Sequence, residues 1–212
     1  MPQNLAQPDD LEIVERRRDI RIVVSLAGRY TLADHRNARG ERRTFSCRAV
    51  NISGSAIALA APVIGNIGER VRTNIDHLGR LDGAVARVLS RGFVMSIAAS
   101  EDERLRLLDR IEWIEKHKNH DVQELRATNR FVPANPSSRL VLATGMTLTC
   151  LVIDLSETGA AVSADVDPEI GTVCAVGTIV GRVVRRFVGG FAVQFINPPR
   201  REEVELMAIV NY

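Results

Sequence analysis

The chain has 212 residues, 45% of them hydrophobic, so it is long enough for two small packed domains and is not expected to be disordered in bulk. Its formal net charge of +2 argues against a chain-wide polycation built for duplex DNA. Three cysteines, none in a CxxC pair, support neither a disulfide framework nor a thiolate zinc site, and we expect Cys47 and Cys150 to be core residues on strands.

The first half of the chain has the pattern of a small antiparallel β-domain. Residues 1–14 are polar and contain two prolines, which predicts a loose tail. Short runs rich in Val, Ile, Ala and Thr then recur about every ten residues, a spacing typical of an antiparallel barrel or sandwich. Hairpin turns are expected at residues 37–40 and 91–92. The predicted strands cover residues 22–32, 44–52, 55–61, 69–75, 80–90 and 92–99.

The apolar spacing then changes to that of a helix over residues 101–118. Acidic residues in its first turn and basic residues at its end complement the helix dipole. We expect Trp113 to be a packing residue of this helix. The predicted apolar stripe consists of Leu105, Leu107, Leu108, Ile111, Trp113 and Ile114.

A second β-rich block follows, and residues 200–210 after it predict a short final helix. Its predicted strands cover residues 138–144, 147–155, 160–164, 172–186 and 190–196. The expected fold class is therefore mainly β, with two small antiparallel β-barrels joined by an α-helix and a short C-terminal helix. The expected divisions are a tail at 1–14, a domain at 15–100, a helical linker at 101–123 and a domain with the final helix at 124–212.

The two halves repeat the same motifs in the same order. Two arginines spaced i, i+4 open each half, and a polar Asn/Asp-x-Ser turn follows each pair. The residues are Arg17, Arg21, Asn51 and Ser53 in the first half and Arg126, Arg130, Asp154 and Ser156 in the second. A period of about one hundred residues indicates a duplicated domain rather than a solenoid.

This combination of residues suits a planar anionic ligand better than covalent chemistry. A guanidinium donates hydrogen bonds in one plane and can clasp either a phosphate or the O6/N7 edge of guanine. The carboxylate of Asp154 can accept hydrogen bonds from N–H donors, and the hydroxyl of Ser156 can reach a phosphate or tie the turn together. We expect Gly159 to supply a backbone conformation with φ > 0 at the end of this turn.

An RxxxR motif followed by [D/N]xSxxG on a small antiparallel barrel resembles the PilZ domain, a bacterial receptor for cyclic di-GMP. Residues 15–21 and 181–195 also resemble PilZ sequences, so the resemblance covers two tandem domains. It implies that Arg17, Arg21, Asn51 and Ser53 line a first ligand site. It implies that Arg126, Arg130, Asp154, Ser156 and Gly159 line a second one.

The two copies differ at two positions of this pattern. Ala56 stands where the family has glycine, and alanine would cost about 1 kcal/mol if that position needs φ > 0. In the family, an arginine just before RxxxR favours a stacked pair of ligands over a single one. That residue is Arg16 in the first copy and Leu125 in the second. We therefore expect a stacked dimer at the first site and a single molecule at the second.

The resemblance implies a cytoplasmic receptor that is not an enzyme, uses no cofactor or metal, binds cyclic di-GMP, changes its domain arrangement and signals to a downstream protein. The four histidines are expected in loops or at a helix end, without metal-site spacing. The longest apolar run, residues 56–64, is too short to span a bilayer, and no signal-peptide pattern is present.

Two alternatives to this function stay open. One is a small basic barrel that binds nucleic acid through the arginine-rich residues 16–48. Aromatic residues make up only 4% of the chain and do not interleave with the basic ones, so stacking platforms are scarce and nucleic acid is not the expected ligand. The other is a PilZ-like interaction module that no longer binds nucleotide.

Overall fold

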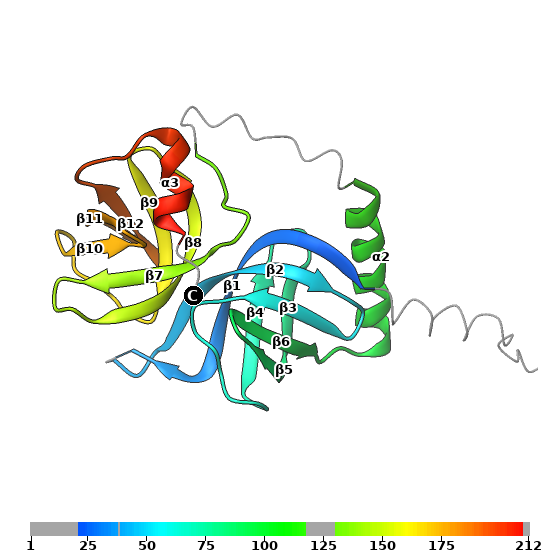
Figure 1. Ribbon diagram of the computed structural model, residues 1–212. Helices are drawn as coiled ribbons and strands as arrows, with labels where there is room; N and C mark the ends of the chain where they lie inside the picture. Colours follow the sequence, from blue (N-terminus) through cyan, green and yellow to red (C-terminus); the bar gives the residue numbers. More distant parts are fainter. Residues whose placement is uncertain (1–20, 38, 118–129, 210–212) are drawn as a thin grey trace, which may run out of the picture.

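Two closed six-stranded antiparallel barrels lie side by side in the computed structural model, which describes residues 21–37, 39–117 and 130–209. One helix packs on the first barrel, at the end of the molecule away from the second, and a short helix packs on the second barrel (Figure 1). The expected fold class is confirmed. The predicted tail, the end of the linker after residue 117 and the residues around the arginine pairs, other than Arg21 and Arg130, lie outside the described residues, so the domain boundaries stay predictions.

The first barrel forms where the alternating pattern predicted strands. Its order around the barrel is β1-β2-β3-β6-β5-β4, and β4, for example, alternates exposed and buried residues throughout. The elements are β1 (Ile22–Arg36), β2 (Arg42–Ile52), β3 (Ala56–Ala60), β4 (Arg70–Ile75), β5 (Gly79–Leu89), β6 (Gly92–Ile97) and α2 (Glu101–His117).

The second barrel has the same strand order as the first, β7-β8-β9-β12-β11-β10, which is the structural counterpart of the sequence repeat. Its elements are β7 (Ser137–Leu142), β8 (Thr147–Ser156), β9 (Gly159–Ala164), β10 (Val173–Val176), β11 (Ile179–Phe187), β12 (Gly190–Phe195) and α3 (Arg201–Ala208).

One predicted strand, residues 172–186, was wrong because it is two strands. The pair between Val176 and Ile179 closes a tight hairpin, and Gly177 takes a φ of 61° inside it. Two-residue hairpin loops require such positive φ values, which glycine adopts without steric cost. The run of apolar residues on both sides hid this turn.

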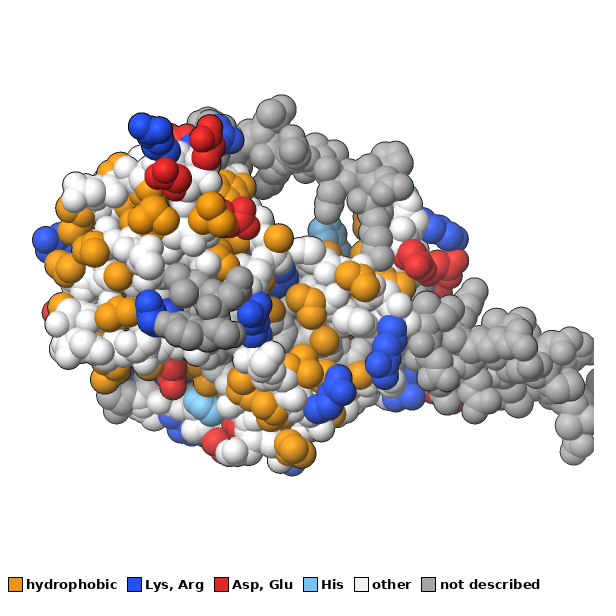
Figure 2. Space-filling model, viewed as in Figure 1, with side chains coloured by type: hydrophobic (Ala, Val, Ile, Leu, Met, Phe, Trp, Pro, Cys, Tyr) orange, Lys and Arg blue, Asp and Glu red, His pale blue; other side chains and the backbone are white. Residues whose placement is uncertain are grey.

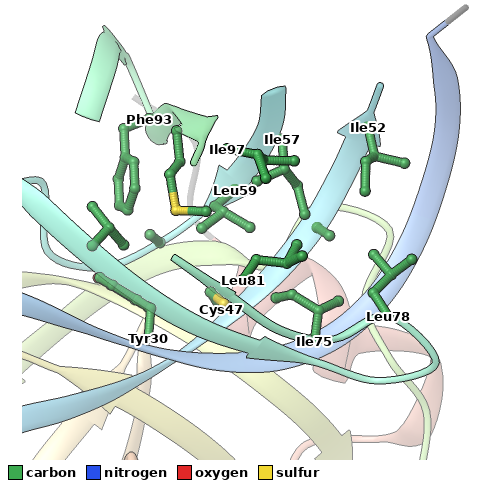
Figure 3. Close-up of a cluster of buried hydrophobic side chains, with 14 of the residues drawn as sticks. Tyr30, Cys47, Ile52, Ile57, Leu59, Ile75, Leu78, Leu81, Phe93 and Ile97 are labelled. Carbon is green, nitrogen blue, oxygen red and sulfur yellow. The ribbon is translucent and has the colours of Figure 1, made fainter. Parts of the chain in front are cut away.

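The core of the first barrel is formed by inward-pointing side chains from all six strands (Figure 3). Leu107, Ile111 and Ile114 of α2 complete this core. The Tyr30 ring lies 5.5 Å, between centroids, from the rings of both Phe45 and Phe93, and its hydroxyl donates to the carbonyl oxygen of Val63 at 2.6 Å. A buried tyrosine hydroxyl needs such a partner, so Tyr30 adds a specific bond to its apolar contact area.

Helix α2 buries a narrower face than the sequence predicted. Leu107, Leu108, Ile111 and Ile114 are buried, whereas Leu105 is 40% exposed. Trp113 is 53% exposed, so the packing role expected for it within the apolar stripe was wrong. Its indole instead stacks on two imidazoles, with ring centroids 4.4 Å from His117 and 6.3 Å from His77.

The prediction that Cys47 and Cys150 are core residues is confirmed, and Cys174 is buried with them. Burial disfavours the thiolate, so it raises the pKa of Cys150 to about 12 and that of Cys174 to about 11. Burial likewise raises the pKa of Cys47 well above its ordinary value. These thiols are therefore protonated at neutral pH.

Strand β2 is buried on both faces, since one face fills the first barrel and the other contacts β8 and β9 of the second. The inward face carries Phe45 and Cys47. The opposite face carries Ser46, whose backbone N–H lies 3.1 Å from both the Ser163 hydroxyl and the Gly189 carbonyl oxygen. The two barrels thus share a specific interface along this strand.

Candidate functional site

The second copy of the motif brings together an arginine and a carboxylate that are far apart in sequence. The Nη1 atom of Arg130 lies 3.0 Å from Oδ1 of Asp154, and the two side chains are 37% and 20% exposed. An ion pair this accessible contributes little to stability, but it holds a guanidinium fork and a carboxylate at one surface point. Arg126 lies outside the described residues.

The backbone next to this pair is also fixed. Phe131 and Leu155 each donate their backbone N–H to the other's carbonyl oxygen, at 2.8 Å in both directions. This bridge fastens residues 130–134, here called the Arg130 segment, to the end of β8. The Arg130 segment is therefore attached to the strand that carries Asp154.

A β-bulge sets the direction of the Asp154 side chain. Ile153 is the extra residue of β8, between the pairs Val152–Val162 and Asp154–Ala161. A bulge bends its strand and re-aims the residues beside it, which here leaves Asp154 partly exposed on the barrel surface.

Ser156 ties the turn that follows Asp154. Its hydroxyl donates to the carbonyl oxygen of Gly159 at 3.2 Å and lies 3.5 Å from the hydroxyl of Thr158. Of the two roles considered for this hydroxyl, closure of the turn is thus the one these contacts support. The turn orders the backbone directly beside Asp154.

Glycine is required at position 159 for a different reason from the one expected. Gly159 does not have a positive φ, so the prediction of a left-handed conformation was wrong. A Cβ atom there would instead lie 2.4 Å from the carbonyl oxygen of Val193 in β12. The close approach of β9 and β12 therefore excludes a side chain.

The first copy forms the same turn although it has Ala56 in place of glycine. The N–H of Ser53 donates to the carbonyl oxygen of Ala56 at 2.8 Å, and the N–H of Ala56 donates to the Ser53 hydroxyl at 3.2 Å. Val50 is the extra residue of a matching bulge, directly before Asn51. Since neither glycine nor positive φ is needed, Ala56 does not prevent the turn.

The arginines of the first copy are mostly beyond what the structure describes. Arg21 is exposed immediately before β1, where Ile22 pairs with Ile52. This pairing corresponds to the bridge between Phe131 and Leu155, so Arg21 occupies the position of Arg130. Arg16 and Arg17 lie outside the described residues.

A groove of about 500 Å³ lies elsewhere among the described residues, and it is lined by side chains of β1, β2, β4, β5 and β6. Its arginines include Arg72, which together with Arg80 donates to Asp82 at 2.8 and 2.9 Å. Asp82 compensates part of this positive charge, and it is the one carboxylate among the residues that line the groove. We place the candidate site at the repeated motif, because there a cationic fork and a carboxylate converge from separate segments of the chain.

The histidines within the described residues have structural partners. His35 lies in β1 and not in a loop, as had been expected, and its Nδ1 atom is 3.5 Å from Oε1 of the buried Glu69. His77 and His117 stack on Trp113. Within residues 21–37, 39–117 and 130–209, no three His, Cys, Asp or Glu side chains are grouped so that they could hold a metal ion. Over the same residues, no helix has the length and apolar character needed to cross a membrane.

Topology and site together define a duplicated antiparallel β-barrel module that carries a surface Arg–Asp pair in its second copy. Residues 124–212 match the family model of the PilZ domain, so the chain contains a PilZ domain in its second half. The first barrel lies outside the matched residues and shares the strand order and the bulge of the second. No curated relative matches the sequence.

Several solved structures are similar over most of the chain, although at low TM-scores. One is Borreliella burgdorferi PlzA in complex with c-di-GMP, with a TM-score of 0.30 and 12% identity, covering 94% of this chain and 96% of that one. Another is the Bacillus subtilis inhibitor of motility, MotI/DgrA, with a TM-score of 0.30 and 11% identity, covering 88% and 94%. A third is Escherichia coli YcgR in complex with c-di-GMP, with a TM-score of 0.27 and 10% identity, covering 91% and 84%. Likenesses this weak add no argument about the ligand of this chain.

Proposed function

We propose that this protein is a cytoplasmic receptor for cyclic di-GMP and not an enzyme. Its second barrel would bind the ligand with Arg126, Arg130, Asp154, Ser156 and Gly159. The observation that carries the proposal is the 3.0 Å pair of Arg130 and Asp154, held at the surface of a PilZ domain. No cofactor or metal is part of the proposal.

The chemistry of this pair matches the two ends of a guanine nucleotide. The Arg130 fork can bond the O6/N7 edge of guanine or a phosphate oxygen, and the Asp154 carboxylate can accept from the N–H groups of the Watson–Crick edge. Ser156 and Gly159 would act by shaping the turn, since the Ser156 hydroxyl closes it and Gly159 leaves room for β12. The ligand would exchange part of the Arg130–Asp154 bond for its own.

We also propose a second ligand site on the first barrel, lined by Arg16, Arg17, Arg21, Asn51 and Ser53. The support is the matching turn and bulge, which place Asn51 where the second copy has Asp154. Arg16 adds a third guanidinium, which would favour a stacked pair of ligands because it can neutralise additional phosphate charge.

Calorimetric titration of the full chain with cyclic di-GMP tests both proposals, with GTP and cyclic AMP as controls. We expect micromolar or tighter binding of cyclic di-GMP alone, with three ligands per chain in total. In an Asp154→Ala variant the stoichiometry should fall to two, and in an Asn51→Ala variant to one. Absence of uptake at micromolar concentrations would overturn the receptor function. Equal stoichiometry at the two sites would overturn only the assignment of the dimer.

The titration also separates this function from the two alternatives. On the face drawn in Figure 2, Lys and Arg side chains are spread over both barrels among neutral and hydrophobic ones and do not form one continuous stripe. A nucleic-acid-binding protein would instead bind oligonucleotides with a steep salt dependence and ignore cyclic di-GMP. A PilZ-like interaction module would bind neither.

We propose that the ligand changes how the two barrels sit relative to each other and that a downstream protein recognises the result. The support is a direct contact between the Arg130 segment and β2, in which the guanidinium of Arg48 donates to the carbonyl oxygen of Pro133 at 2.9 Å. Small-angle X-ray scattering of the full chain at ligand saturation is expected to give a changed radius of gyration. Identical profiles with and without cyclic di-GMP, at proven saturation, would exclude this rearrangement.

A further inference from the structure

Arg48 is a buried cation at the interface between the barrels, only 7% exposed, on the outward face of β2. Its Nη1 atom donates to the carbonyl oxygen of Pro133 at 2.9 Å, and its Nη2 atom donates to that of Ile153 at 3.2 Å. Among the described residues, no carboxylate forms an ion pair with it. Burial accordingly lowers the pKa of the Arg48 guanidinium.

The two carbonyl groups that Arg48 binds belong to the two halves of the candidate site. Pro133 lies in the Arg130 segment, and Ile153 directly precedes Asp154. Ile153 is also the bulged residue, which the regular ladder of strand pairs leaves out. A single side chain of the first barrel therefore joins the arginine-bearing and carboxylate-bearing segments of the second.

A buried arginine without a carboxylate partner is costly, since its charge has been taken out of water. The planar fork of arginine can join two acceptors on separate segments, whereas lysine offers only a point charge. The two carbonyl groups compensate part of the cost, and the fork gives the segments one fixed separation. Simple packing of two barrels needs no such pair of hydrogen bonds to two separate segments.

We propose that Arg48 is a positioning residue for the cyclic di-GMP site of the second barrel, which rests on the proposed function. It fixes the distance between the Arg130 segment and the Ile153 bulge and so presets the Arg130–Asp154 geometry before the ligand arrives. The first barrel then contributes to ligand binding by the second domain, although Arg48 does not touch the ligand.

The first test measures affinity with the full chain. Arg48→Met is expected to weaken binding of cyclic di-GMP at the second site about five- to tenfold. The matched control is Ser46→Ala, which removes the hydroxyl that donates to Gly189 at 3.2 Å on the same face of the same strand. We expect the control to bind within twofold of the unmodified protein. Equal affinity of Arg48→Met and the unmodified protein would overturn the proposal, as would an equal loss in both variants.

A double-mutant comparison separates positioning from general loss of structure. If Arg48 acts through Arg130, Arg48→Met should have little further effect in an Arg130→Ala background. A loss of the full five- to tenfold in both backgrounds would show that Arg48 only supports folding. If Arg48→Met fails to give a cooperative unfolding transition, Arg48→Lys, which keeps the charge but not the fork, is judged by the same criteria.

A second measurement needs no ligand and therefore stands apart from the proposed function. Hydrogen exchange of the amides of Phe131 and Leu155, which bond each other, reports how firmly the two segments are joined. Arg48→Met should speed this exchange about tenfold, and Ser46→Ala should not. Faster exchange in Arg48→Met, together with no ligand uptake by the unmodified protein, would support the link that Arg48 makes between the two segments and overturn only the receptor function. Unchanged exchange would overturn the proposal that Arg48 holds the two segments together.

Discussion

Replacing Arg130 with alanine is expected to weaken cyclic di-GMP binding at the second site ten- to a hundredfold, or about 1–3 kcal/mol. The substitution removes the guanidinium that lies 3.0 Å from Asp154 and leaves that carboxylate to face an anionic ligand without its cation. The lost hydrogen bonds weaken binding, and so does the repulsion between the Asp154 carboxylate and the ligand phosphates. Calorimetric titration of the full-length variant measures the loss directly.

A matched control for charge is Arg182→Ala in the same barrel. Arg182 lies on β11, is exposed, and donates to the carbonyl oxygen of Gly171 at 2.7 Å, away from Asp154. The Arg182→Ala substitution changes the net charge of the protein by the same amount as Arg130→Ala. Its affinity for cyclic di-GMP should stay within about twofold of that of the unmodified protein. If Arg130→Ala binds no more weakly than Arg182→Ala, the site has been assigned to the wrong residues.

Replacing Gly159 with alanine is expected to destabilise the second barrel by about 1–3 kcal/mol. The new Cβ atom would come within 2.4 Å of the Val193 carbonyl oxygen, a backbone atom that can move only with its strand. The two strands must therefore separate or shift, which also displaces the Ser156 turn. Hydrogen exchange should accelerate in residues 159–164 and 190–195.

The first barrel supplies the control for this substitution. Ala56→Gly converts the first copy to the glycine of the second, and only backbone entropy and one methyl group change. We expect a cost below about 1 kcal/mol and no exchange difference beyond β3 and β6. Unchanged exchange in Gly159→Ala would contradict the close-approach explanation, because no positive φ is present at that position to penalise alanine.

The strands could be predicted from the sequence because most of them have one face toward a barrel core and one toward solvent, which imposes a period of two. The hairpin at Gly177 could not, since residues on both sides of it are apolar and mask the turn. The buried face of α2 was predicted too wide, since Leu105 and Trp113 are exposed. The stacking of Trp113 with His77 depends on where the β4–β5 turn lies relative to the helix, which a helical period does not describe.

The candidate site was predictable in part. The repeat of two weak motifs drew attention to Asp154 and Arg130, which the fold brings into contact over a separation of 24 residues. The reason for glycine at position 159 was not predictable, because it depends on an approach between β9 and β12. Arg48 could not be found at all, since in the sequence it is one arginine among many and its partners are backbone carbonyl groups of another domain.

Strand β2 carries both Arg48 and, three residues later, Asn51 of the first motif. A ligand that pulled on Asn51 would move the same strand that fixes the Arg130 segment. Linkage requires that such an influence on affinity be equal in both directions. Occupancy of one barrel would then tune the affinity of the other, so that the protein would respond to its signal over a concentration range that neither barrel would set alone.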